Sequence, residues 1–224
     1  MRKSLFLAAT LAASAMLVLA PAGAALAAGK TDVLTTVKVG GPNVKANNVL
    51  QTGLKARTVL TFSQVGVAHP ISLKCTKSTI TSKVAANPPK PSTAVELVTG
   101  ETVTGCKANT TLVQSVTVTA THLPYKVTVS DAKGFPVTVF GPTAVLKIVP
   151  APSTKIKPFS CTYFAKTIKG NFSNSGSLTS FSKQVFTLVK KGSGIFCPAK
   201  GALTATYGPV VDLSVVGHPH VFVN

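Results

Sequence analysis

The sequence has few acidic residues: five Asp and Glu stand against 23 Lys and Arg, and the formal net charge is +18 at pH 7. The acids are Asp32, Glu96, Glu101, Asp131 and Asp212. Hydrolytic catalysis usually needs paired carboxylates, or a nucleophile with a base and an orienting acid, so few residues could supply it. A Gly-x-Ser-x-Gly sequence, which would indicate a nucleophile elbow, is also missing. We therefore predict no catalytic residue, no cofactor site and no enzymatic activity.

Tryptophan is absent, only three tyrosines occur, and Arg57 is the only arginine after residue 27. Stacking of bases needs aromatic side chains, and bidentate recognition of phosphates or bases relies on arginine. These shortages argue against a specific nucleic-acid partner. The many lysines instead predict a salt-sensitive attraction to anionic cell-wall or matrix polymers, which the field of a positive surface concentrates.

Long apolar runs are confined to the first 27 residues. Arg2 and Lys3 precede an apolar run over 5–20, and small residues follow at 25–27. This pattern is typical of a secretory signal peptide that is cleaved before Ala28. The run is short for a helix that crosses a bilayer, which takes about 20 residues. We expect a secreted or cell-surface protein with no transmembrane segment in the mature chain.

The expected organisation is a signal peptide over 1–27, an N-terminal lead-in or edge strand over 28–57, and a single all-β domain over 58–224. The range 83–93 contains three prolines. Because proline cannot donate to a central strand ladder, we predict an exposed loop there.

The chain has four cysteines: Cys75, Cys106, Cys161 and Cys197. An even number in an exported chain predicts two disulfides, and three pairings are possible. We predict the local pairing, Cys75 with Cys106 and Cys161 with Cys197, because each bridge then closes a loop within one half of the fold. The spacing of these residues does not fit zinc ligands, which come two to four residues apart.

Apolar residues alternate with Thr, Ser or Lys at a period of two, as in 116–119, 126–130 and 137–139. Such alternation is typical of antiparallel strands with one buried and one solvated face. Gly- and Pro-containing turns separate these runs, and no segment after residue 27 shows sustained helical periodicity. The sequence therefore predicts an all-β fold, either an antiparallel β-sandwich of immunoglobulin-like type or a partly closed barrel.

A weak internal similarity suggests two pseudo-repeated halves. Residues 72–76 resemble 158–162, and the sequence from Cys106 to 120 resembles that from Cys197 to 206. In this interpretation each half is a strand, a Cys, a hairpin, a second Cys and a strand. Chance similarity between β-rich segments is the alternative.

The chain also resembles a group of small exported actinobacterial proteins that have four cysteines and an immunoglobulin-like, β-rich build. The resemblance covers about 58–212 and rests on Cys75-Thr76, Gly105-Cys106, 123–127, 161–163, 168–175, 195–197 and 205–207. Tyr125 stands where the group would have Trp, and the lysine content is higher. The resemblance implies export and an all-β fold, and it implies no site residue and no activity.

Two sets of histidines are candidates for a metal site or a catalytic site. His218 and His220 are two residues apart, so on an extended chain both could reach one metal ion, but no third ligand is evident. We expect a terminal strand with two solvated histidines. His122 could combine with Asp131 and a serine in a hydrolase, because such groups assemble in space rather than in sequence.

These observations lead to one expected function and two alternatives. We predict a cationic, non-catalytic binding or structural protein that adheres to anionic envelope or matrix polymers. A secreted effector, such as an inhibitor or a toxin-like protein that docks the 83–93 loop into a partner, is the first alternative. An extracellular hydrolase is the second.

Overall fold

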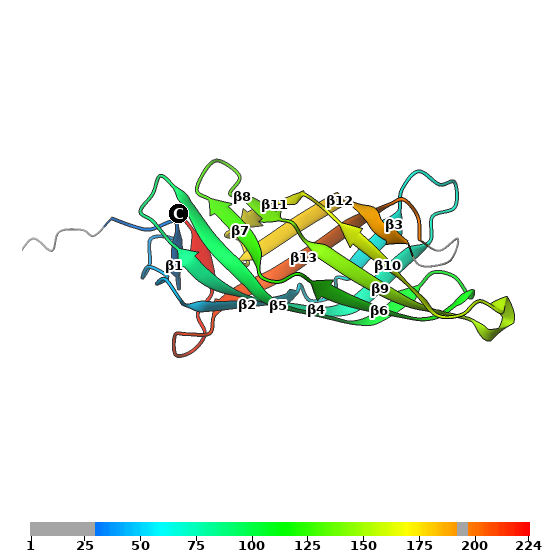
Figure 1. Cartoon of the computed structure of the whole chain (residues 1–224). Helices are drawn as coiled ribbons and strands as arrows, with labels where there is room; N and C mark the ends of the chain where they lie inside the picture. The colour runs from blue at the N-terminus through cyan, green and yellow to red at the C-terminus, as the bar shows by residue number, and fades with distance from the viewer. Residues whose placement is uncertain (1–29, 192–196) are drawn as a thin grey trace, which may run out of the picture.

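The computed structural model describes residues 30–191 and 197–224, and the predicted signal peptide lies outside these ranges. Fourteen strands and one short 3-10 helix, η1 (Pro152–Thr154), make up the described fold (Figure 1). The strands are β1 (Leu34–Thr36), β2 (Val49–Leu54), β3 (Leu60–Gln64), β4 (Ser72–Ala86), β5 (Thr93–Ala108), β6 (Val113–Thr121), β7 (Tyr125–Ser130), β8 (Pro136–Phe140), β9 (Thr143–Pro150), β10 (Phe159–Phe164), β11 (Thr167–Ser173), β12 (Leu178–Lys191), β13 (Lys200–Asp212) and β14 (Val221–Val223). The prediction of an all-β fold is confirmed.

Twelve strands form one antiparallel sheet that closes on itself. Strands β4, β5, β12 and β13 are 13 to 16 residues long, and each changes neighbours partway along its length. At one end they close a ring with β2, β7, β8 and β11, which we call the terminal ring. At the other end they close a second ring with β3, β6, β9 and β10, which we call the disulfide ring. Figure 1 shows the long strands running through both rings.

The alternation seen in the sequence places the core inside these rings. On β7, Tyr125, Val127 and Val129 are buried, whereas Lys126 between them is exposed. The same alternation on β8 buries Val137 and Val139. Burial of such side chains contributes about 1.5 to 3 kcal/mol each, which stabilises the closed sheet against the unfolded chain.

Both disulfides have the predicted pairing, and both lie in the disulfide ring. Cys75 and Cys106 face each other directly across the β4–β5 hairpin, with a Cα–Cα distance of 3.9 Å. Cys161 on β10 is joined to Cys197, which precedes β13. The two bridges occupy different topological places: the first joins the two strands of one hairpin, and the second joins β10 to the segment before β13, on either side of the β11–β12 hairpin.

A two-stranded sheet of β1 and β14 closes the outer end of the terminal ring (Figure 1). We call residues 32–44 and 221–224 the end cap. Its strand residues are buried although several are polar: Thr35 is 0% exposed and Thr36 is 3% exposed. The range 28–57, predicted as a lead-in or edge strand, thus contributes β1 to the end cap and β2 to the main sheet, between β13 and β4.

Asparagine side chains hold the end cap in place. Asn87 accepts a hydrogen bond from the N–H of Leu34 (2.8 Å) and donates to the carbonyl oxygens of Leu34 and Val44 (2.8 Å each). Asn174 similarly accepts from the N–H of Val223 and donates to its carbonyl oxygen. Because a two-stranded sheet leaves many backbone groups unpaired, these side chains supply partners that a further strand would otherwise provide.

The loop predicted over 83–93 is shorter than expected. Strand β4 continues to Ala86, because it pairs with β5 through two register shifts. The remaining loop packs against the end cap: the carbonyl oxygen of Pro88 accepts a hydrogen bond from Val33, and Lys90 donates one to Thr31. The prolines therefore end the strand, as predicted, but do so four residues later.

Replacement of Asn87 by Ala should loosen the end cap. The substitution leaves the N–H of Leu34 and the carbonyl of Val44 without their partner, whereas the carbonyl of Leu34 keeps the N–H of Val44, so we expect the free energy of unfolding to fall by about 2 to 4 kcal/mol. Urea unfolding with the disulfides intact measures this change. Asn171→Ala is the matched control, because Asn171 is exposed on β11. Equal stability of the two variants would contradict the clamping role of Asn87.

Candidate functional site: an interior cavity with two glutamates

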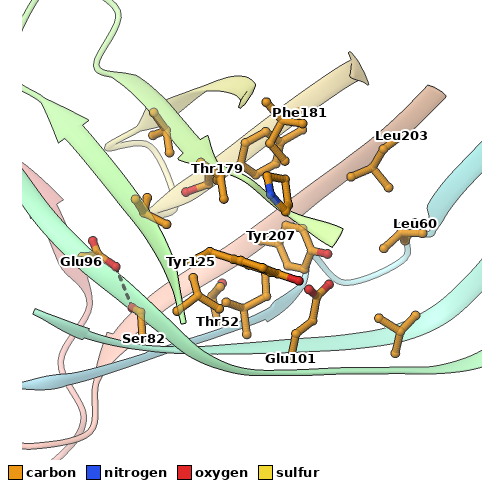
Figure 2. A pocket seen from close by; sticks show the side chains of 18 of the residues that line it. Thr52, Leu60, Ser82, Glu96, Glu101, Tyr125, Thr179, Phe181, Leu203 and Tyr207 are labelled. Atoms are coloured by element: carbon orange, nitrogen blue, oxygen red, sulfur yellow. Dashed lines mark hydrogen bonds between the residues drawn. The ribbon is translucent and has the colours of Figure 1, made fainter. Parts of the chain in front are cut away.

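The interior of the closed sheet contains a cavity of about 170 Å³. Its wall comes from both rings and from the end cap, which contributes Leu34 and Val221. Most of the wall is apolar, and its members include Val98, Val127, Val139, Phe181 and Leu203. Figure 2 shows Phe181 and Leu203 on one side of the space and Thr52 and Glu101 on the other. Natural cores rarely leave voids larger than a water molecule, so a cavity of this size is an unusual feature.

The cavity wall has four ionisable residues: Glu96, Glu101, Tyr125 and Tyr207. The two glutamates are the only glutamates in the whole sequence. Among the residues that the structure describes, no Lys, Arg or His lines the cavity, although the chain has 23 Lys and Arg. Both acids therefore face an apolar interior without a positive partner, an arrangement that is costly in a structural core.

A β-bulge turns Glu101 toward the cavity. Ser82 pairs with Val98 and Thr81 pairs with Gly100, so Thr99 is an extra residue on β5. Before the bulge, Glu96 and Val98 face inward at the usual period of two. After the extra residue, the next inward position is Glu101, which an unbroken strand would have placed on the outer face.

Glu96 has one hydrogen-bond partner in the cavity wall. The hydroxyl group of Ser82 donates to its Oε2 atom at 2.6 Å (Figure 2). Burial raises the pKa of Glu96, and the Ser82 hydrogen bond opposes part of that rise. The Ser82 hydrogen bond fixes the orientation of the Glu96 carboxyl group. Burial favours its protonated form.

Glu101 makes no side-chain hydrogen bond or ion pair within the described ranges. It is half-buried, and the surface that it keeps faces the cavity. Burial raises the pKa of Glu101 from 4.5 to about 7. Its carboxyl group lies beside the hydroxyl ends of Tyr125 and Tyr207 (Figure 2). Burial raises the pKa of both phenols, and the negative charge of Glu101 raises them further.

The two tyrosine hydroxyls already have partners. Tyr125 donates to the carbonyl oxygen of Thr143 (2.7 Å) and accepts from the N–H of the same residue (3.1 Å). The hydroxyl of Tyr207 hydrogen-bonds the hydroxyl of Ser78 at 3.1 Å. Glu101 is therefore the ionisable residue of the wall whose hydrogen-bonding capacity is unused, and it points into free space.

Sequence reasoning did not identify this site. Glu96 shares the period of two with Ala94 and Val98, but Val95 and Leu97 on the other face are equally apolar, so the pattern does not assign a face. The orientation of Glu101 depends on a bulge that only Gly100 hints at, since glycine inside a strand often marks one. The rarity of glutamate in the chain was the strongest available signal.

The candidate histidines, His122, His218 and His220, are not part of the cavity wall. His218 and His220 are exposed, and the described ranges contain no group of three or more His, Cys, Asp or Glu residues that could hold a metal ion. His122 contacts the hydroxyl of its neighbour Thr121 at 3.2 Å. Asp131 instead accepts a hydrogen bond from the N–H of Ser92.

On the outer surface, lysines face one another across paired strands. Lys74 on β4 lies directly opposite Lys107 on β5, and both are exposed, as is the nearby Lys77. Like charges directly opposite each other in a sheet destabilise it. This patch of Lys74, Lys77 and Lys107 adjoins the Cys75–Cys106 bridge, which holds its two strands together.

Comparison of the chain with protein-family models, with curated proteins and with solved structures finds no match. Among the described residues, no helix is long and apolar enough to span a membrane. The two disulfides are compatible with an extracellular location, since such bridges persist in oxidising compartments.

Glu101 should make stability depend on pH. A pKa of about 7 in the folded protein exceeds the unfolded value of 4.5, so the folded state binds more protons between these values. Stability from this group is complete below pH 4.5 and is lost as the pH rises to about 7. We expect Glu101→Gln to gain up to about 3 kcal/mol relative to the wild type across this window. Unfolding curves recorded from pH 4.5 to 8 test the prediction, and a constant difference between the two proteins would contradict it.

Proposed function

We propose that this protein is a secreted or cell-surface, non-catalytic binding protein that holds a small, largely apolar molecule in its interior cavity. The observation that carries the proposal is the cavity itself, a space of about 170 Å³ lined by apolar side chains and two unneutralised glutamates. An engineered apolar cavity of about 150 Å³ binds benzene, so the size suits a small organic molecule.

Energetics support a binding role over a structural one. Unfilled space in a core destabilises a protein in proportion to its volume. A protein selected only for rigidity would gain stability by filling the space with larger side chains. Small closed antiparallel sheets are known to hold one small ligand in their interior. Keeping the space open therefore favours occupation by a ligand.

The proposed location rests on the N-terminal sequence and the disulfides. Residues 1–27 have the pattern of a secretory signal, and the two bridges suit an oxidising compartment. The non-catalytic part of the proposal rests on the sequence, which has only five acidic residues and no Gly-x-Ser-x-Gly nucleophile elbow.

The second candidate function is adhesion to anionic polymers through the lysine surface. The opposed residues Lys74 and Lys107 favour it, because an anionic partner would relieve their mutual repulsion. This function uses the outside of the molecule and the first uses the inside. The two are compatible, and each can be tested separately.

Neutral aromatic probes test the cavity. We expect toluene and benzyl alcohol to bind and to raise the melting temperature, because a ligand that binds only the folded state stabilises it. Val98→Phe should fill part of the cavity and abolish this rise, since Val98 lines the wall and is 7% exposed. Val185→Phe is the matched control on the outer surface, where Val185 is 49% exposed. Absence of binding by the wild type, or equal binding by the Val98→Phe variant, would refute the proposal.

Retention on an immobilised polyanion tests the surface function. Exposed charges are screened over about 8 Å at physiological ionic strength, so retention should weaken as salt rises. Simultaneous Lys74→Gln and Lys107→Gln substitution should lower the eluting salt concentration more than Lys45→Gln with Lys133→Gln, a control pair of exposed lysines. Equal shifts for the two pairs would show that only net charge matters.

A further inference from the structure

The cavity wall contains two acidic side chains, although the chain as a whole is strongly basic. Glu96 and Glu101 bring two carboxyl groups into a space whose remaining wall is mostly apolar, with several hydroxyl groups and the amide of Gln51. The chain has no other glutamate, and none of the basic residues within the described part of the chain enters the cavity wall. A cavity that needed only to bind an apolar molecule would not require either acid.

We propose that the molecule held in the cavity is an organic cation, a protonated amine with an apolar body, whose ammonium group pairs with Glu101. This inference rests on the proposed function, because it names the chemical class of the ligand for the same cavity. The apolar body contacts the valine, leucine and phenylalanine wall, and the ammonium group donates hydrogen bonds to the carboxylate.

Geometry selects Glu101 as the residue that meets the ammonium group. Its carboxyl oxygens have no hydrogen-bond donor from the described residues, and they face the free space (Figure 2). Glu96 is instead held by Ser82 at 2.6 Å. The hydroxyls of Tyr125 and Tyr207 hydrogen-bond Thr143 and Ser78. They lie beside Glu101 without donating a hydrogen bond to it.

Other ligand classes fit the wall less well. An anion would meet two acids and no base. A metal ion such as Ca²⁺ takes six to eight oxygen ligands, and the described residues hold no group of three candidate metal ligands. A neutral molecule could be oriented by Ser, Thr or Asn, which cost far less to bury than an acid does. The combination of two acids and an apolar wall is specific to a cation with a hydrophobic body.

Binding of the amine should depend on pH through Glu101. The titratable groups that face it are Glu96 on the same strand, Tyr125 on β7 and Tyr207 on β13. Both phenols have raised pKa values, so neither ionises between pH 5 and 8. Since the pKa of Glu101 is about 7, its ionised fraction increases across this interval, and so should the affinity for an amine.

A series of isosteric probes tests the inference: benzylamine, benzyl alcohol and benzoate share one ring and differ in charge. Titration calorimetry at pH 7.5 should show benzylamine binding the wild type about tenfold or more tightly than benzyl alcohol, with benzoate weakest, because charge-assisted hydrogen bonds exceed neutral ones. Glu101→Gln keeps the size of the side chain and removes its charge. It should abolish the preference for benzylamine while retaining benzyl alcohol binding.

The outcomes separate the two proposals. If the neutral probes bind but benzylamine binds no better, or if Glu101→Gln leaves its advantage intact, the cation inference is wrong and the cavity function stands. If no probe binds, the proposed function itself fails. Loss of benzylamine affinity at pH 5 with unchanged benzyl alcohol affinity would support Glu101 as the partner.

Raised salt should not weaken benzylamine binding, because the positive outer surface repels the free amine and salt screens that repulsion.

Discussion

The architecture depends on one constraint, which is that four long strands must satisfy two different sets of neighbours. Strands β4, β5, β12 and β13 form two antiparallel hairpins, and each strand leaves one partner and takes another near its middle. Each long strand then has a neighbour on both sides at both ends, so the twelve-stranded sheet closes on itself. A closed antiparallel sheet made of shorter strands would form only one ring. Here the two rings are stacked end to end and their cores are continuous.

The change of neighbours has a physical consequence for the interior. Where one ring passes into the next, the strands bend and bulge, as at Thr99 on β5. Phe62 and Phe186, which line the cavity, pack edge to face against each other. The inward orientation of Glu101 follows from this distortion, because a regular strand would have placed the acid on the outer face.

The sequence predicted the elements better than their assembly. Alternation at Val127, Val129 and Val137 assigned buried faces, because each apolar residue there has polar neighbours. Loop length favoured the pairing of Cys75 with Cys106, and these residues do face each other. The closure of β10 onto β12 and the stacking of rings could not be predicted, since residues far apart in the chain meet there and no local pattern encodes their register.

The candidate site was the part least accessible from sequence. Glu96 and Glu101 have the polar character of surface residues, and only the bulge and the closed sheet turn them inward. Similarly, Thr35 and Thr36 are polar by type but buried by position, because Asn87 and Asn224 supply hydrogen bonds around them. In both places the chemistry of a residue depends on distant strands rather than on its neighbours in the chain.

The end cap ties completion of the cavity wall to the order in which the polypeptide is made. Val221 belongs to the wall of the cavity, and Leu34 of β1 pairs with Val223 of β14. Ribosomes release the amino-terminal side first, so β1 is made long before its partner strand. The wall of the cavity is therefore complete only after β14 has been synthesised and has paired with β1.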